Sequence, residues 1–293
     1  MNKRFLPPFF CLFPLLVFFM QGCGTIPRRP SAAARRALGL NSKAEAAFRQ
    51  GDYEEALGLY NGALKVSSGI EYADGIAINL LNMAAIYRRL GDRENAQKCL
   101  DKILILDRRG VPFSASNLSD AAFMKAILFT DGGEYRTAIG WTNRALGFCA
   151  SGPCRHEGKV YNLKARIELL GDDVSAALRN AGLGLKLNGK SGDRREKANS
   201  LRLLAGARAL DGEYQTAEGL YKSSLVIDKD LGQGLKIEAD LQGIGAALLK
   251  QGKYSDAENY YRRATAVGRA LDDTKGVQAA ETMKKICETR DRE

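Results

Sequence analysis

The chain has 293 residues and a net charge of +10, from 44 Lys and Arg against 34 Asp and Glu. This excess of positive charge predicts a basic surface. Several classes of function are excluded by what the sequence lacks. It has no base-stacking or recognition-helix motif, which argues against nucleic-acid binding. It also has no HExxH motif and no phosphate-binding glycine loop, and its single histidine is too few for a histidine-based metal site.

Residues 1–22 have the pattern of a secretory signal, because Lys3 and Arg4 precede the apolar stretch Phe5–Met20. That stretch contains three prolines and is short for a permanent crossing of the ~30 Å hydrocarbon core. Cys23 follows the small residue Gly22, and this arrangement resembles the lipobox of bacterial lipoproteins. The resemblance implies cleavage before Cys23 and acylation of its thiol. Ordinary secretion and an uncleaved anchor are the alternatives.

Residues 23–36 contain two prolines, two arginine pairs and no apolar periodicity, which predicts a flexible tether close to a membrane surface. Gly24 stands where lipoproteins retained at the inner membrane of enteric bacteria carry aspartate. The lipoprotein resemblance therefore implies the outer membrane of a bacterial cell envelope, on its periplasmic side. Without residues 1–22 the chain keeps 42 basic and 34 acidic residues. The excess favours an anionic surface as a partner, and an ordinary solvated surface is the alternative.

A glycine followed five residues later by an alanine recurs about every 40 residues, which indicates an internal repeat. The pairs are Gly51/Ala56, Gly91/Ala96, Gly133/Ala138, Gly171/Ala176, Gly212/Ala217 and Gly252/Ala257. Apolar residues with helical spacing lie on both sides of each glycine. In the second repeat, Gly91 is expected to end one helix in the left-handed conformation and Asp92 to cap the next. Each repeat is therefore predicted to be a helix-turn-helix unit.

The residues around each glycine resemble the tetratricopeptide repeat (TPR). In the first repeat, Tyr53 lies two residues after the glycine, the aromatic Tyr60 nine residues after it and the small Ala63 twelve residues after it. The fifth and sixth repeats have the same pattern. The fourth repeat departs from it at Lys164 and Asn180, and we expect its helices to be less regular. The resemblance covers residues 37–270.

The resemblance implies an all-α, right-handed superhelical solenoid of six helix-turn-helix units over residues 37–270. Residues 271–293 are predicted to form a capping helix and tail, since the end of a solenoid needs a polar outer face. The alternative is that Val277 and Met283 on this helix contact a partner.

Two cysteines flank a Gly-Pro turn between the third and fourth repeats. Cys149 and Cys154 are a candidate disulfide in an oxidising compartment. His156 follows closely, but no orienting partner or oxyanion stabiliser is evident, so we predict no catalytic residue, metal or cofactor. Cys99 and Cys287 are expected to be small buried residues on helices.

In this family the first helix of each repeat lines a concave groove. Matching the repeats in phase gives the candidate groove residues Asn82, Arg88, Arg89, Phe123, Ile127, Tyr161, Arg202 and Gln242. Their aromatic and arginine side chains suit a peptide or helix. The alternative for Phe123 and Tyr161 is packing between repeats. The set does not reproduce the carboxylate clamp of chaperone-binding members, which disfavours chaperone tails as ligands.

These features favour an envelope-anchored adaptor or scaffold. It is expected to bind an unidentified envelope protein or peptide and to be attached to the membrane by a lipid anchor. Repeats on a lipidated cysteine resemble the pilotin-type lipoproteins of type IV pili and the outer-membrane assembly lipoproteins. Two alternatives remain. One is a thiol-redox or hydrolytic component that uses Cys149, Cys154 and His156. The other is a regulatory TPR protein with an uncleaved anchor.

Overall fold

The computed structural model describes residues 31–154 and 156–292, so the expected signal and Cys23 lie outside the described residues. The described chain folds into thirteen α-helices and contains no strand. The helices are α1 Ala32–Gln50, α2 Tyr53–Gly69, α3 Ala73–Arg89, α4 Arg93–Arg108, α5 Ala115–Asp131, α6 Tyr135–Ala150, α7 Glu157–Leu170, α8 Val174–Ser191, α9 Arg194–Leu210, α10 Tyr214–Asp230, α11 Gly234–Lys250, α12 Tyr254–Ala270 and α13 Thr274–Arg290. Within these ranges, no helix is both long and apolar enough to cross a membrane.

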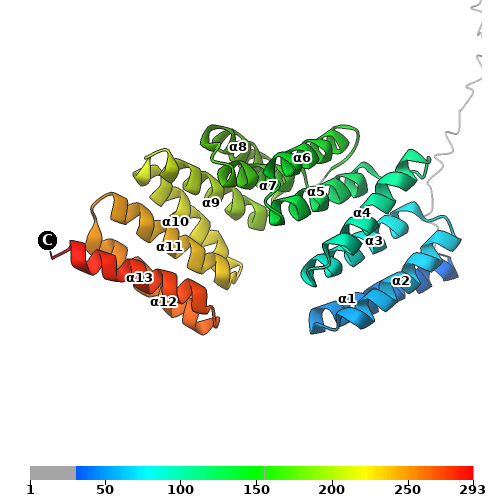
Figure 1. Ribbon diagram of the computed structural model, residues 1–293, viewed down its shortest axis with the longest axis horizontal. Helices are drawn as coiled ribbons and strands as arrows, with labels where there is room; N and C mark the ends of the chain where they lie inside the picture. The colour runs from blue at the N-terminus through cyan, green and yellow to red at the C-terminus, as the bar shows by residue number, and fades with distance from the viewer. Residues whose placement is uncertain (1–30, 155, 293) are drawn as a thin grey trace, which may run out of the picture.

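The helices pack in chain order as six antiparallel pairs followed by α13, and the pairs stack into an arch (Figure 1). Each odd-numbered helix from α1 to α13 contacts the next odd-numbered helix, whereas no two even-numbered helices of the described chain do. In a curved stack, the layer whose members touch lies on the inner side of the curve. The odd helices therefore form the concave face. The predicted all-α solenoid of six units with a capping helix is confirmed.

The turn inside each pair follows from the residues at its centre. Gly91 has a φ of +77°, a conformation that costs a residue with a side chain about 1–2 kcal/mol. The Asp92 carboxylate then accepts a 3.0 Å hydrogen bond from the Asn95 N–H and caps α4. Ala96, on the first turn of α4, is fully buried against the preceding helix. The helix end, the reversal and the close approach predicted from this segment are all present.

Small and aromatic residues of each pair interlock. Gly245 on α11 lies against the ring of Tyr261 on α12, and a Cβ at position 245 would come within about 3.0 Å of that ring. Tyr261 is almost fully buried, together with Leu241, Ile244 and Ala264. Full burial of a large apolar side chain stabilises a fold by roughly 1.5–3 kcal/mol. These contacts within and between the pairs hold the array together.

The fourth repeat is regular, and the departure expected from its sequence is wrong. Here Gly171 has a φ of −100°, and the left-handed residue is Asp172 at +61°. The turn is therefore shifted by one residue, and Asp173 caps α8 where the residue after the glycine caps the helix in other repeats. With that shift, the small buried positions are Ala165 and Ala177. Lys164 and Asn180 lie one residue before the small buried positions Ala165 and Ala181, and so they do not depart from the repeat pattern.

The first helix also begins earlier than expected. Residues 23–36 are predicted to form a tether, but α1 starts at Ala32, and the Ser31 Oγ accepts a 3.1 Å hydrogen bond from the Ala34 N–H. Serine is a strong helix N-cap and alanine is the best helix former, which explains the earlier start. The alanine run of the proposed tether is thus the first turn of the array.

Candidate functional site

The concave face holds a groove of about 700 Å³ that runs across five odd helices. It has an apolar floor and a rim of charged and amide side chains. Its lining residues are Arg88 of α3, Phe123 and Ile127 of α5, Lys159, Asn162, Leu163, Arg166 and Leu169 of α7, Glu196, Asn199, Arg202, Leu203 and Gly206 of α9, Tyr221 of α10 and Lys236 of α11. A concave surface that combines an apolar floor with polar side chains is a common form of binding site.

Half of the groove residues expected from the sequence meet here. Arg88, Phe123, Ile127 and Arg202 all line the groove. Their side chains come from three repeats and are brought together by the stacking of α3, α5 and α9. These residues can act on one ligand.

The other expected groove residues lie elsewhere. Arg89 donates a 2.5 Å hydrogen bond to the Tyr53 Oη and so ties the end of α3 to the start of α2. Gln242 donates a 3.2 Å hydrogen bond to the Gly276 carbonyl of α13. Asn82 and Tyr161 are half-buried on α3 and α7 and are not among the lining residues.

The absence of Tyr161 from the lining follows from the shifted turn of the fourth repeat. Once the register is corrected, the residue equivalent to Arg202 and Gln242 is Asn162, which is buried in the groove lining. The sequence signal that would have identified it is the Asp172-Asp173 pair, because a second aspartate can cap α8 one residue later than usual.

The side chains at the repeat position shared by Asn162 and Arg202 make contacts between repeats. Asn162 Nδ2 donates a 2.9 Å hydrogen bond to the Glu196 carbonyl of α9, and Arg202 Nε donates a 2.7 Å bond to Asp240 Oδ1 of α11. In α5, Phe123 holds the same position, and its ring lies 4.7 Å from the Lys159 Nζ of α7. Side chains at this position therefore fix one odd helix against the next and shape the groove.

Burial controls the charge of one carboxyl beneath the groove. Asp240 is fully buried, and desolvation raises its pKa to about 6 even though the Arg202 guanidinium acts to lower it. The second carboxyl paired with Arg202 belongs to Asp228. The groove is thus built on a buried cluster of one arginine and two aspartates.

Sequence reasoning missed several groove residues that carry charge. Arg166 and Lys236 are exposed on α7 and α11, and Lys159 is half-buried on α7. Lys159 and Lys236 hold repeat positions that differ from those of the expected residues, so matching repeats in phase does not select them. Arg166 is equivalent to Ile127, but only after the register of the fourth repeat is corrected. Only the stacking of the helices brings them to the same face.

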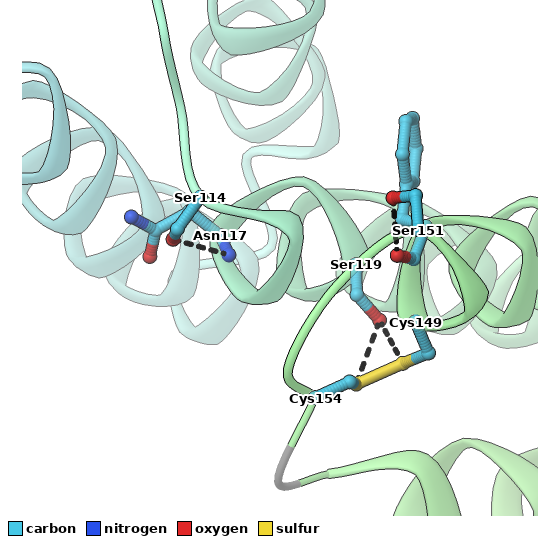
Figure 2. The surroundings of a disulfide bond; sticks show 7 residues. Ser114, Asn117, Ser119, Cys149, Ser151 and Cys154 are labelled. Atoms are coloured by element: carbon cyan, nitrogen blue, oxygen red, sulfur yellow. Dashed lines mark hydrogen bonds between the residues drawn. A yellow bond between two sulfur atoms is a disulfide. The ribbon is translucent and has the colours of Figure 1, made fainter.

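The second candidate site is the turn between α6 and α7, where Cys149 and Cys154 form a disulfide with Cα atoms 4.9 Å apart. Figure 2 shows the Ser119 hydroxyl of α5 directed at both sulfurs, with Oγ–Sγ distances of 3.2 Å to Cys149 and 3.9 Å to Cys154. With both sulfurs bonded, neither cysteine offers a thiolate. His156 is exposed beside this turn.

An aspartate near this turn has an altered pKa. Burial raises the pKa of Asp120, while the nearby charges of His156 and Lys159 act to lower it. In residues 31–154 and 156–292, no group of three or more His, Cys, Asp or Glu side chains could hold a metal ion.

Comparisons with known proteins agree on the repeat architecture. The tetratricopeptide repeat family model matches residues 35–109 and 196–270, which together are just over half of the chain. No curated protein matches the sequence. Solved structures do match, and the three described next have sequence identities of 14–16%.

The apo form of RapI superposes with a TM-score of 0.68 at 14% identity, covering 87% of this chain and 72% of RapI. PilW, described as a widely conserved type IV pilus biogenesis factor, gives a TM-score of 0.61 at 16% identity, covering 83% of this chain and 97% of PilW. A Rap protein complexed with Competence and Sporulation Factor gives a TM-score of 0.59 at 14% identity, covering 84% of this chain and 69% of the Rap protein. At these identities the similarity establishes the fold alone.

Proposed function

Because the chain belongs to the tetratricopeptide repeat family, we propose that it is a non-catalytic adaptor that binds a polypeptide partner in its concave groove. The observation that carries this proposal is the groove across α3 to α11, to which five consecutive odd helices contribute. Such a surface offers one partner many contacts along its length. The superposition on a Rap protein that was complexed with Competence and Sporulation Factor agrees with a binding role.

The adaptor is proposed to be anchored in a bacterial cell envelope by a lipid on Cys23, with the array in the periplasm at the outer membrane. The support is the signal pattern of residues 1–22 and the cysteine that follows it. Since α1 begins at Ala32, the tether is residues 24–31, which span at most about 30 Å when extended. The groove would then lie close to the membrane and face partners in the same layer. PilW has a similar fold, so a pilus or secretion complex is a candidate assembly.

Lipid labelling tests the anchor, and photo-crosslinking tests the groove. A palmitate analogue should label the full chain in bacterial cells and should fail to label Cys23→Ser. Labelling that persists in Cys23→Ser would exclude the lipid anchor at this position.

A photo-crosslinking residue at Ile127, in the groove floor, should capture a discrete partner in intact cells. The same residue at Arg136, exposed on α6 away from the groove, should not. Cys149→Ser should leave capture at Ile127 unchanged, because the disulfide lies outside the groove. Equal capture at Ile127 and Arg136 would contradict the groove as the binding site, and loss of capture in Cys149→Ser would favour a role for the cysteines.

A further inference from the structure

The charge of the groove is strongly asymmetric. Five basic side chains line it, whereas Glu196 is the one acidic side chain of the lining. The Glu196 carboxylate is already engaged, because Oε2 accepts hydrogen bonds from Asn162 Nδ2 at 2.9 Å and Asn199 Nδ2 at 3.2 Å. The basic residues are Arg88, Lys159, Arg166, Arg202 and Lys236.

Two of the five cations have carboxylate partners within the protein. Arg88 Nε pairs with Asp131 Oδ2 at 2.7 Å, and Arg202 pairs with two buried aspartates. Lys159 lies over the Phe123 ring and forms no ion pair in the described chain, although its charge acts to lower the pKa of the nearby Asp120. The charges of Arg88 and Arg202 are therefore largely balanced before any ligand arrives.

Arg166 and Lys236 have no hydrogen bond or ion pair through their side chains to any residue that the structure describes. They lie on α7 and α11, on either side of α9. Although the Lys236 side chain as a whole is exposed, the groove partly desolvates its amine and lowers the pKa. Repulsion from Arg202 and Arg166 lowers the pKa of Lys236 further and outweighs the attraction of Asp228 and Glu196. This part of the groove is short of negative charge, and a carboxylate placed there would relieve the repulsion.

Beside these cations lies an apolar floor. Phe123 and Leu163 are buried, and Ile127, Leu169 and Leu203 are half-buried in the lining. Helices in contact lie roughly 8–10 Å apart, so the four steps from α3 to α11 span about 32–40 Å. An extended chain advances about 3.3 Å per residue, so the groove matches a segment of roughly twelve residues.

We propose that the groove binds an extended acidic segment of a partner polypeptide. An Asp or Glu side chain of the partner lies between Arg166 and Lys236, and apolar side chains lie on the floor around Ile127. This inference rests on the proposed adaptor function and names the chemistry of its partner. An internal acidic side chain suffices, so the free carboxylate of a chain end is not required.

The probe is a fluorescent twelve-residue peptide, capped at both ends, in which two glutamates and one leucine alternate. The control peptide has glutamine in place of every glutamate. Both are titrated with the full chain in mild detergent and followed by fluorescence anisotropy at low salt. We expect the glutamate peptide to bind at least about tenfold more tightly than the control, and to weaken steeply with added salt because the interaction is electrostatic.

Variants that remove charge identify the site. Arg166→Gln and Lys236→Gln should each raise the Kd of the glutamate peptide about three- to fivefold, and the double variant about tenfold or more. The matched controls are Arg136→Gln on α6 and Lys186→Gln on α8, whose exposed cations likewise have no described partner. These should change the Kd by less than about twofold. Circular dichroism checks that each variant keeps its helices.

Three outcomes would overturn the inference. One is equal affinity for the glutamate and glutamine peptides, or no binding of either. Another is an equal loss in the control variants. The third is that Arg166→Gln and Lys236→Gln reduce binding to vesicles with 30% phosphatidylglycerol and leave peptide binding unchanged, which would assign these cations to a lipid surface. In each case, continued capture of a protein at Ile127 would leave the adaptor function standing, whereas loss of that capture would remove it.

Discussion

Arg202 lies between two buried aspartates and connects α9, α10 and α11. Its guanidinium donates a 2.7 Å hydrogen bond to Asp240 and a 3.0 Å bond to the Ser224 hydroxyl, and it also contacts Asp228. The side chain of Arg202 is 16% exposed, and those of Asp228 and Asp240 are 2% and 0% exposed. Removing one partner of a buried pair leaves an uncompensated charge, at a cost of roughly 3–5 kcal/mol.

Arg202→Met should therefore destabilise the packing of α9 to α11 by about 3 kcal/mol or more at pH 7.5. The cost should be smaller at pH 5. Burial raises the folded-state pKa of Asp240 from 3.8 to about 6, so the folded state takes up a proton as the pH falls through 6. In the wild type, this uptake stabilises the fold by about 1.4 kcal/mol between pH 7.5 and pH 5. Without Arg202 the pKa is higher still and the gain on acidification is larger.

Hydrogen exchange of the backbone amides in α9 to α11, corrected for the intrinsic exchange rate at each pH, measures this local stability. A local readout is needed because a repeat array can open in parts. The control is Arg194→Met, which breaks the Arg194–Asp230 pair, whose side chains are 54% and 56% exposed, and should cost less than about 1 kcal/mol. The reasoning is refuted if Arg202→Met costs no more than the control, or costs the same at both pH values.

Three further predictions concern packing and turns. Gly184→Ala should destabilise the protein by roughly 1–3 kcal/mol in urea unfolding, because its Cβ would collide with the amide oxygen of Asn162. Gly182→Ala on the same helix has open space around its Cβ and should stabilise the protein by about 0.5–1 kcal/mol. Gly252→Ala should cost about 1 kcal/mol because φ is +75°, and an unchanged unfolding midpoint would contradict this. Under native reducing conditions, mass spectrometry should find iodoacetamide on the half-buried Cys154 but not on Cys99 and Cys287, since both are buried and burial raises their thiol pKa values. Labelling of Cys99 before global unfolding would show that its helix opens more readily than its packing implies.

The repeat fold could be predicted because each unit is encoded locally. Gly91, Asp92 and Ala96 specify a helix end, a cap and a close helix contact within six residues of sequence. The fourth repeat shows the limit of that reading. One residue, Asp172, takes the left-handed conformation that glycine takes in the other turns, and nothing in the glycine–alanine spacing signals the shift.

The sequence predicted groove residues by assuming that equivalent positions of successive repeats face the groove, and this assumption holds for half of them. Arg88, Phe123, Ile127 and Arg202 line the groove, while Asn82, Arg89, Tyr161 and Gln242 do not. The role of all eight residues in binding stays a prediction. The same applies to lipidation of Cys23.

The sequence by itself determined that the chain is a stack of helix pairs, because turn residues, caps and small packing positions act within a single unit. The sequence is also the source of the hypothesis that the chain is exported and anchored by a lipid, because that hypothesis depends on residues 1–23 alone. Only the tertiary structure decided which charges meet. Arg166 and Lys236 are far apart in sequence and differ in repeat position, and they face one groove because successive odd helices pack side by side along the concave face. That meeting of charges depends on the angles and spacing between units, which no single repeat encodes.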